Sequence, residues 1–498
     1  MTTSEVEVEQ DQRSEMLMLL DRQREAFRRE GPPTLSVRQN RIDRLLALLL
    51  DNTDAFTAAM NSDFGTRSRS ASLFTEVIGV IPVIEHTRSH VAQWMRATKL
   101  LRVARVVGLT AAVEPTPLGV VGIVGPWNFP VNLVVLPAAA AFAAGNRVMI
   151  KMSEITPRTA ALMKELAPQY FDPTELAVIT GGRDTAATFT GLPFDHLFFT
   201  GSPEVGKLVQ RAAAANLVPV TLELGGKNPV VVARDADIPT AAARIATARM
   251  VNGGQVCVCP DYVFVPQGRV EEFLAAVRRE LTARFGSIVA NPDYCSCVNE
   301  ANFDRVLELL DDAAANGASV ESVGPAGELL PDRASRKIAP TIVRGADDRM
   351  RIAREEIFGP VLMVMTYTDP QEVVDYVNDR PAPLVAYWYG PGGADFRDFV
   401  RRTRSGGVAR NDFAAQMIPS AAPFGGVGRS GMGAYHGKAG FDAFSHYRTV
   451  VGSDLPFSIT GTAAPPFRKP MKMYAEVQLR LARRRTHRRL EGKSGVNS

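Results

Sequence analysis

Residues 118–151 read LGVVGIVGPWNFPVNLVVLPAAAAFAAGNRVMIK, and this stretch decides the expected fold. Leu118–Val124 is a short apolar run typical of a buried strand, Val131–Ala144 is predicted to be a helix, and Arg147–Lys151 is predicted to be the next strand. A strand, a helix and a second strand in this order indicate parallel strands joined by a crossover helix. The stretch therefore predicts an α/β fold with a doubly wound sheet.

The alternation of short apolar runs and helix-like segments continues toward the C-terminus. Further strands are predicted at Ala177–Thr180, His196–Thr200, Val230–Ala233, Tyr262–Val265 and Val361–Met365. Helices are predicted at Pro157–Tyr170, Val205–Ala214, Thr240–Met250, Arg269–Phe285 and Glu300–Asn316, and near the N-terminus at Glu15–Arg29 and Val37–Met60. Two such blocks in tandem predict two sheets with a crevice between them, and catalytic residues belong in such a crevice.

The composition is that of a soluble globular protein. The 498 residues are 46% hydrophobic and 22% charged, which excludes fibrous and disordered chains. At this length two or three domains are expected. The apolar run Val131–Ala144 is shorter than a bilayer span, so no transmembrane helix is predicted. The acidic, polar start Met1–Gln12 lacks the layout of a signal peptide, and a cytoplasmic location is expected.

The net charge of +4 conceals a basic C-terminal tail. Residues 468–493 contain ten Lys/Arg and two Glu, a local charge of +8, which leaves −4 for the rest of the chain. The polar link Thr460–Pro470 separates this tail from the body. Such a tail is either a helix that touches an anionic membrane or nucleic acid, or, more often, a solvated extension.

The four cysteines indicate a reducing compartment. They stand at 257, 259, 295 and 297, too few and too closely paired for a disulfide framework at this length. Two CxC pairs also raise a zinc interpretation. The usual CxxC spacing and a histidine cluster are both missing, so no metal is predicted.

Two motifs together indicate covalent chemistry. Residues 252–257 read NGGQVC, so Cys257 is approached through two glycines, and residues 223–227 read ELGGK, so Glu223 stands at the edge of a glycine turn. One thiol nucleophile and one general base suit acyl chemistry, in which a thioester forms and water then cleaves it.

Other polar residues follow predicted strands. Residues 201–206, GSPEVG, open a helix-like run where backbone amides favour a phosphate, although such a turn is more often only structural. Lys151 and Glu154 can hydrogen-bond ribose hydroxyls or remain solvated. Asn128 lies among apolar and aromatic residues, where its amide can donate to an oxyanion or form a turn.

Five motifs in this order, GPWNFP, FTGS, ELGGK, GQxC and EEIFGP, resemble the aldehyde dehydrogenase superfamily over about Leu20–Val451. Residues 423–433, PFGGVGRSGMG, with Tyr435–Gly437, are similar to its class 3 branch. Residues 20–27, LDRQREAF, are most similar to bacterial coniferyl aldehyde dehydrogenases. The resemblance implies a Rossmann-type cofactor domain, a second α/β catalytic domain and a β oligomerisation arm.

On this resemblance the parts of the chain are assigned as follows. Residues 1–222 form the dinucleotide-binding domain with its N-terminal helices, and an arm hairpin lies at about 106–118. Residues 223–406 form the catalytic domain, 407–451 the C-terminal arm, and 452–498 the basic tail. Family members form dimers or tetramers, so a homodimer or homotetramer is expected.

The resemblance also implies the catalytic residues. Cys257 is the nucleophile that attacks the aldehyde carbon, and the amide of Asn128 with the backbone N–H of Cys257 holds the oxyanion. Glu223 activates the water that hydrolyses the thioester. Because a free thiol titrates near ~8.5, the local environment has to favour the thiolate.

A cofactor site follows from the same resemblance. Its expected residues are Trp127, Lys151, Glu154, Gly201, Ser202, Gly225, Glu356 and Phe358. Glu356 and Phe358 are expected at the nicotinamide ribose and ring, and Lys151 and Glu154 at the adenine ribose. Glu154 favours NAD, because a carboxylate near the ribose repels the 2′-phosphate of NADP, but class 3 relatives accept both.

The expected substrate is a small-molecule aldehyde. An aromatic or phenylpropenyl aldehyde such as coniferaldehyde is the first expectation, and a medium or long aliphatic aldehyde is the second. Two alternatives remain at this point. One is a CoA-acylating enzyme of the same fold, against which Glu223 argues, and the other is a non-catalytic binding protein that the basic tail docks to a membrane or an acidic partner.

Overall fold

A computed structural model describes residues 3–101, 108–458 and 460–491, with α1 (Thr3–Glu30) as its first helix. The chain divides into two compact units. The larger unit comprises Met1–Arg96 with Pro115–His446, and the smaller comprises Ala97–Glu114 with Tyr447–Ser498.

The first sheet has six strands in the order β15-β7-β6-β3-β4-β5. Its parallel strands are β3 (Val120–Val124), β4 (Arg147–Lys151), β5 (Leu176–Ile179), β6 (His196–Gly201) and β7 (Val220–Leu224). The short β15 (Gly431–Met432) pairs antiparallel with β7 and aligns Gly431 with Glu223. All residues of β3, β4 and β5 are buried; β3 and β5 are apolar throughout, and β4 begins and ends with the buried Arg147 and Lys151.

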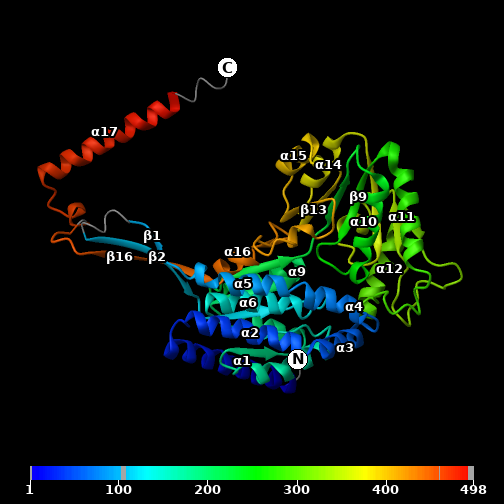
Figure 1. Cartoon of the computed structure of the whole chain (residues 1–498), viewed down its shortest axis with the longest axis horizontal. Coiled ribbons are helices and arrows are strands. Elements are labelled where there is room, and N and C mark those ends of the chain that lie inside the picture. The colour runs from blue at the N-terminus through cyan, green and yellow to red at the C-terminus, as the bar shows by residue number, and fades with distance from the viewer. Residues whose placement is uncertain (1–2, 102–107, 459, 492–498) are drawn as a thin grey trace. The chain divides into compact units, whose positions relative to one another are not determined.

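Helices cover both faces of this sheet (Figure 1). One face packs against α2 (Leu35–Asp51), α5 (Ile81–Trp94), α6 (Asn132–Ala144) and α7 (Pro157–Tyr170). The other packs against α1, α8 (Arg183–Thr190) and α9 (Pro203–Ala214). Every residue of α6 after Asn132 is buried, which explains why this helix is apolar all round. The doubly wound sheet is confirmed.

The second sheet has seven strands in the order β10-β11-β12-β9-β8-β13-β14. They are β8 (Asn228–Val232), β9 (Pro260–Pro266), β10 (Ser319–Ser322), β11 (Thr341–Arg344), β12 (Val361–Tyr367), β13 (Val385–Tyr389) and β14 (Gly407–Arg410). Only the β10–β11 pairing is antiparallel among them. The helices of this part are α10 (Ile238–Met250), α11 (Val270–Arg284), α12 (Glu300–Ala315), α13 (Arg351–Arg354), α14 (Pro370–Asn378) and α15 (Ala394–Arg402).

The helical pattern predicted over Val37–Met60 is interrupted at one residue. Helix α2 ends at Asp51 and α3 (Thr53–Phe64) begins two residues later. Asn52 takes a non-helical conformation, and its amide donates to the Leu48 carbonyl at 2.9 Å and to the Tyr170 hydroxyl at 3.1 Å. The break therefore depends partly on a residue of α7. After α3 follow α4 (Arg69–Ser72) and the π-helical turn η1 (Leu73–Ile78).

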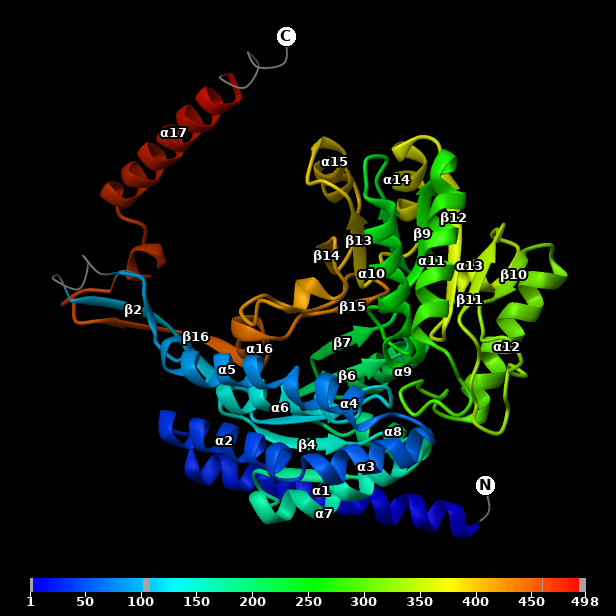
Figure 2. The same ribbon diagram turned by 45° about the vertical axis from the view of Figure 1, so that its right-hand side comes forward.

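A third sheet has the order β1-β2-β16 (Figure 2). Its strands are β1 (Thr98–Lys99), β2 (Leu109–Pro117) and β16 (Ser445–Ser453), and β1 runs antiparallel to β2. Of the hairpin predicted at 106–118, residues 106 and 107 lie outside the described residues, and most of the remainder forms β2. After α16 (Gly437–Ala443), β16 and the short turn η6 (Thr460–Ala463), the basic tail forms helix α17 (Lys469–Glu491).

The predicted domain limits at 222/223, 406/407 and 451/452 remain predictions. Strand β7 of the six-stranded sheet crosses the 222/223 limit, because it ends at Leu224. The same sheet includes β15, which lies beyond the 406/407 limit. No helix in the described ranges is long and apolar enough to cross a membrane.

Candidate active site

Cys257 follows a tight turn, η3 (Val251–Gly254), that leads into β9. Asn252, Gly253 and Gly254 all have positive φ angles, of 52°, 63° and 77°. A side chain at Gly254 would overlap the carbonyl oxygen of Gly359, so only glycine fits where these two loops meet. The turn thus brings Cys257 close to the loop that carries Glu356 and Phe358.

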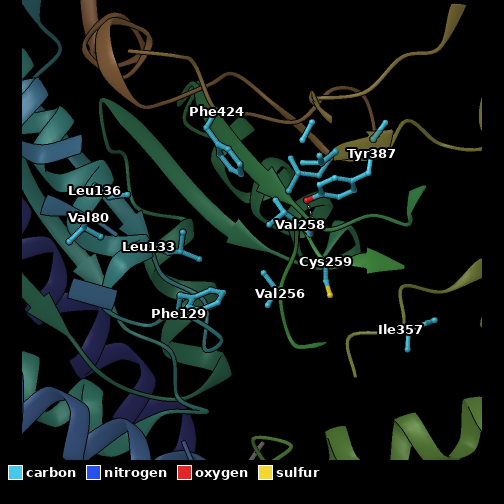
Figure 3. Close-up of a cluster of buried hydrophobic side chains, with 14 of the residues drawn as sticks. Val80, Phe129, Leu133, Leu136, Val256, Val258, Cys259, Ile357, Tyr387 and Phe424 are labelled. Carbon is cyan, nitrogen blue, oxygen red and sulfur yellow. Dashed lines mark hydrogen bonds between the residues drawn. The ribbon is translucent and has the colours of Figure 1, made fainter. Parts of the chain in front are cut away.

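Two side chains from neighbouring strands hold the backbone of the cysteine loop. Asn228, at the start of β8, donates to the carbonyls of Cys257 at 2.7 Å and Cys259 at 3.0 Å. The hydroxyl of Tyr387, on β13, donates to the Val258 carbonyl at 2.6 Å (Figure 3). Sequence reasoning missed both residues. Asn228 offered a signal, since it is an amide that opens a continuous apolar strand and must find a partner there.

The Cys257 thiol is in an environment that disfavours its charge. Burial raises its pKa to about 12, and the nearby carboxylates of Glu356 and Glu223 act in the same direction. The backbone N–H groups of Cys257 and Val258 lower it only in part. A positive charge near the sulfur, or neutral carboxyl groups, would favour the reactive thiolate.

Glu223 lies near the end of β7 and is 4% exposed. Neither of its carboxylate oxygens has a hydrogen-bond partner within the described part of the chain. Burial raises its pKa well above the ordinary value. A buried carboxyl without a partner is costly, and its raised pKa makes the carboxylate a stronger base than an exposed one.

Tyr435 is a third titratable group near this pair, and sequence reasoning assigned it no chemistry. Burial raises the pKa of its phenol well above the ordinary value, and the charges of Glu223 and Cys257 add to this shift. Its ring packs against Phe198 and Phe424 at 5.1 and 5.7 Å between centroids. The phenol therefore belongs to the surroundings of both predicted catalytic side chains.

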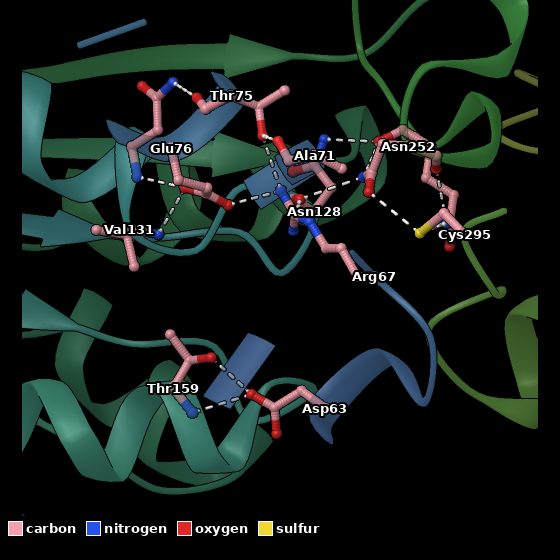
Figure 4. A network of polar contacts seen from close by, with 12 residues as sticks. Asp63, Arg67, Ala71, Thr75, Glu76, Asn128, Val131, Thr159, Asn252 and Cys295 are labelled. Atoms are coloured by element: carbon pink, nitrogen blue, oxygen red, sulfur yellow. Dashed lines mark hydrogen bonds and ion pairs between the residues drawn. The ribbon is translucent and has the colours of Figure 1, made fainter. Parts of the chain in front are cut away.

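Asn128 lies in the segment between β3 and α6 and is buried. Its side-chain amide donates to the carbonyl of Gln255, two residues before Cys257, at 3.2 Å. Its own carbonyl accepts from the Asn252 side chain at 3.3 Å (Figure 4). The structure thus joins the predicted oxyanion residue to the loop that carries the nucleophile.

Four of the residues expected in the cofactor site lie together, including the two expected at the nicotinamide, Glu356 and Phe358. Trp127 and Phe358 meet edge to face with ring centroids 5.3 Å apart. A side chain at Gly225 would overlap the Glu356 carboxylate, so this glycine permits the close approach. Burial and Asp261 raise the pKa of Glu356 to about 8. The backbone of Phe358 has φ = 50°, a strained value for a non-glycine residue that the loop maintains.

The residues expected at the adenine ribose occupy the ends of β4 and the following turn. The Lys151 ammonium donates to the Met152 carbonyl at 2.8 Å and lies 3.5 Å from the Glu154 carboxylate. Burial lowers the Lys151 pKa. Glu154 borders a pocket of about 480 Å³ that also reaches Thr180 and Gly181. This pocket has room for part of a nucleotide.

Gly201 ends β6, and Ser202 is the N-cap of α9. The Ser202 hydroxyl accepts from the Val205 backbone N–H at 3.3 Å, so it already stabilises the first turn of the helix. The amide groups at this helix start are suited to a phosphate. The structure thus places the predicted phosphate motif at a strand-to-helix junction, as the sequence indicated.

The remaining cysteines do not form a metal cluster with other ligands in the described residues. All four thiols are free, and Cys259, Cys295 and Cys297 are buried. The Cys259 thiol lies 3.5 Å from the Ala248 carbonyl, and burial raises its pKa to about 11.

Comparison with known proteins gives consistent results. The sequence profile described as "Aldehyde dehydrogenase family" matches residues 3–450. A coniferyl aldehyde dehydrogenase of Pseudomonas sp. (strain HR199 / DSM 7063) is 46% identical over 432 residues, 87% of this chain and 89% of the relative. An "Aldehyde dehydrogenase, dimeric NADP-preferring" of Rattus norvegicus is 35% identical, covering 87% and 94%. The substrate-bound structure of Staphylococcus aureus AldH superposes with a TM-score of 0.85 at 32% identity, covering 93% and 99%.

Proposed function

The chain belongs to the aldehyde dehydrogenase family, and from this we propose that Cys257, Glu223 and Asn128 oxidise an aldehyde to its carboxylate with NAD or NADP. One observation carries the proposal. A buried carboxylate without a hydrogen-bond partner, Glu223, lies close enough to Cys257 to raise the thiol pKa. A nucleophile beside an unsatisfied base is what thioester formation and hydrolysis require.

In the first half of the reaction the Cys257 thiolate forms a bond to the aldehyde carbon, the C=O π bond breaks, and the carbonyl oxygen becomes an oxyanion. The Asn128 amide has a second N–H beyond the one that it donates to Gln255, and this N–H and the Cys257 backbone N–H would hold the oxyanion. NAD or NADP supplies the hydride acceptor when bound. Loss of hydride from the adduct leaves a thioester on Cys257.

In the second half Glu223 takes a proton from water, and the resulting hydroxide attacks the thioester carbon. The C–S bond breaks, which releases the carboxylic acid and regenerates the Cys257 thiolate in the enzyme. Burial raises the pKa of Glu223, which makes its carboxylate a stronger base than that of an exposed glutamate.

The residues present fit a nicotinamide dinucleotide. Trp127, Phe358 and Glu356 would surround the nicotinamide and its ribose, since Gly225 leaves the Glu356 carboxylate room beside the turn. The pocket of about 480 Å³ beside Glu154 would take the adenosine part. Glu154 favours NAD, because its half-exposed carboxylate would repel a 2′-phosphate.

For the substrate we propose coniferaldehyde or a related aromatic aldehyde, with medium and long aliphatic aldehydes second. The support is the 46% identity to an enzyme named for coniferyl aldehyde. Glu223 disfavours a CoA-acylating reaction, because transfer to CoA does not need a base that activates water. The intact set Cys257, Glu223 and Asn128 argues against a non-catalytic binding protein.

We also propose that the protein is a homodimer or homotetramer and that its tail contacts an anionic surface. Strand β16 lies at the edge of its sheet and exposes Val450 and Val451, and an exposed apolar edge favours pairing with another copy. No residue of α17 is buried, and its Lys and Arg side chains suit peripheral contact with anionic lipid.

The decisive experiment measures NADH formation with NAD and a panel of coniferaldehyde, benzaldehyde and dodecanal, with Cys257→Ser as the control. The unsubstituted protein is expected to form NADH, and Cys257→Ser is expected not to. The ranking of the three aldehydes by rate assigns the substrate class. Absence of turnover with NAD and with NADP on all three would contradict the proposal. Turnover that appears only after CoA is added would favour the acylating alternative.

A further inference from the structure

Arg67 and Glu76 form an ion pair in the interior of the larger unit. The Arg67 Nη2 and Glu76 Oε1 atoms lie 2.9 Å apart, and both side chains are fully buried. Arg67 precedes α4 and Glu76 lies in η1, so neither belongs to the two motifs that indicate the chemistry.

The Arg67 guanidinium is oriented toward the main chain of Asn128. Its Nη1 donates to the Asn128 carbonyl oxygen at 2.9 Å, and its Nη2 also donates to Thr75 Oγ1 at 3.2 Å (Figure 4). The guanidinium carbon lies 4.9 Å from the ring centroid of Phe64 and 5.3 Å from that of Phe129. Rings at these distances attract the guanidinium charge.

Glu76 fixes the other end of the same segment. Its second oxygen accepts from the backbone N–H groups of Val131 at 3.2 Å and Asn132 at 2.7 Å. These amides stand at the start of α6, where the helix dipole favours a negative charge. One ion pair therefore binds the chain at Asn128 and again three and four residues later.

Stability alone does not explain this pair. Removing two charges from water is costly, and replacing a buried ion pair by apolar side chains is often neutral or stabilising. The contacts of the pair instead converge on the segment that presents the Asn128 amide to the cysteine loop, where that amide donates to the Gln255 carbonyl.

We propose that Arg67 is a positioning residue that, together with Glu76, fixes the Asn128 backbone so that the Asn128 amide faces the oxyanion formed at Cys257. This inference rests on the proposed role of Asn128. A lysine at position 67 keeps the charge but lacks the planar fork that reaches the carbonyl and the carboxylate at once. Since small misplacements of a catalytic group reduce rates strongly, Arg67→Lys is expected to lower kcat about tenfold or more.

Arg41→Lys is the matched control. Arg41 is also buried and pairs with Glu175 at 2.9 Å, but this pair lies between α2 and the residue before β5, away from Asn128. Both variants are expected to lower the melting temperature, and only Arg67→Lys is expected to lower kcat. Circular dichroism and thermal melts establish that each variant is folded.

A double-mutant cycle with Asn128→Ala separates positioning from general damage. If Arg67 acts through Asn128, the loss of kcat from Arg67→Lys disappears in the Asn128→Ala background, while the loss of melting temperature persists. An equal fold-loss of kcat in both backgrounds would overturn the inference, and so would unchanged kcat in Arg67→Lys alone.

Two further variants distinguish failure of this inference from failure of the proposed function. Asn128→Ala by itself tests the proposed function, and full activity of that variant would remove the oxyanion role and the inference with it. Glu76→Gln repeats the cycle from the partner side if Arg67→Lys does not fold. Failure of both substitutions to give folded protein would assign the pair a purely structural role and overturn the inference.

Discussion

The carboxyl group of Glu223 has an environment that a structural residue would not tolerate without compensation. It is buried, both oxygens lack partners in the described chain, and its pKa is raised by burial. Glu223→Gln is expected to keep the initial burst of NADH unchanged, because only thioester hydrolysis needs the base. Its steady-state turnover is expected to fall by ~10²-fold or more. Stopped-flow absorbance at 340 nm separates the two phases, and a variant that loses the burst as well would contradict the assignment.

The same substitution is expected to stabilise the folded protein at neutral pH. The folded-state pKa of Glu223 lies above its unfolded value, so the protonated carboxyl favours folding at low pH and this contribution is lost as the pH rises. A neutral amide removes that pH dependence, with an expected gain of about 1 kcal/mol. Thermal melts of both proteins at pH 5 and pH 8 test this, and the difference between them should be larger at pH 8.

The pH dependence of Cys257 alkylation tests whether the charges of neighbouring groups act on the sulfur. Burial and the carboxylates of Glu356 and Glu223 raise its pKa to about 12, so alkylation by iodoacetamide should be slow at neutral pH and accelerate as the pH rises. Glu223→Gln removes one negative neighbour and should shift this profile to lower pH. Adding NAD, whose nicotinamide is positively charged, should shift it in the same direction. A profile that neither change moves would show that these charges do not act on the sulfur.

At the level of strands and helices, local signals predicted the elements well where the run was apolar and clearly bounded. Arg147–Lys151 and Pro157–Tyr170 have the predicted limits, because apolar runs there meet turn residues at both ends. The interruption at Asn52 was missed, since one of its hydrogen bonds reaches Tyr170, 118 residues away. The local sequence cannot reveal such a contact.

In the candidate site, too, some residues could be predicted from the local sequence and others could not. Cys257, Glu223 and Asn128 stand in motifs that are short in sequence and could be recognised there. Asn228 and Tyr387 act on the cysteine loop from other strands, and Tyr435 approaches Glu223 through the β15–β7 pairing region. Those three depend on how the sheets assemble, so their roles became visible only in the structure.

Asn228 lies on β8 and hydrogen-bonds the segment before β9 and strand β13, so its substitution tests how these strands hold the cysteine loop. Its amide holds the carbonyls of Cys257 and Cys259 before β9, and its oxygen accepts from the Val385 backbone N–H on β13 at 2.9 Å. Asn228→Ala leaves these buried groups unpaired, with an expected loss of about 2 kcal/mol of unfolding free energy and a lower kcat. Asn228→Asp keeps the acceptor but sets a buried carboxylate oxygen against two carbonyl oxygens, so it should be at least as destabilising as Asn228→Ala at neutral pH. Urea unfolding that is unchanged in Asn228→Ala would contradict this role.

Catalysis is expected not to require helix α17. None of its residues is buried, so deletion of residues 469–498 is expected to leave kcat and the melting temperature of the enzyme unchanged. Sedimentation with phosphatidylserine vesicles should fall in the deletion variant and with rising salt, because basic side chains are screened. Equal sedimentation of both proteins, or retention on neutral phosphatidylcholine vesicles alone, would contradict contact with an anionic surface.

For the whole molecule, the proposed association of copies can be tested at the edge of the third sheet. Strand β16 lies beside β2 at one edge, and Val451 on it is 65% exposed, an unusual position for an apolar side chain unless another surface covers it. Val451→Lys is therefore expected to shift the mass measured by light scattering toward the monomer. Leu329→Lys is the matched control, because Leu329 is 92% exposed but belongs to the larger unit and to no strand of this sheet. A dimer that survives Val451→Lys, or one that Leu329→Lys also disrupts, would place the interface elsewhere.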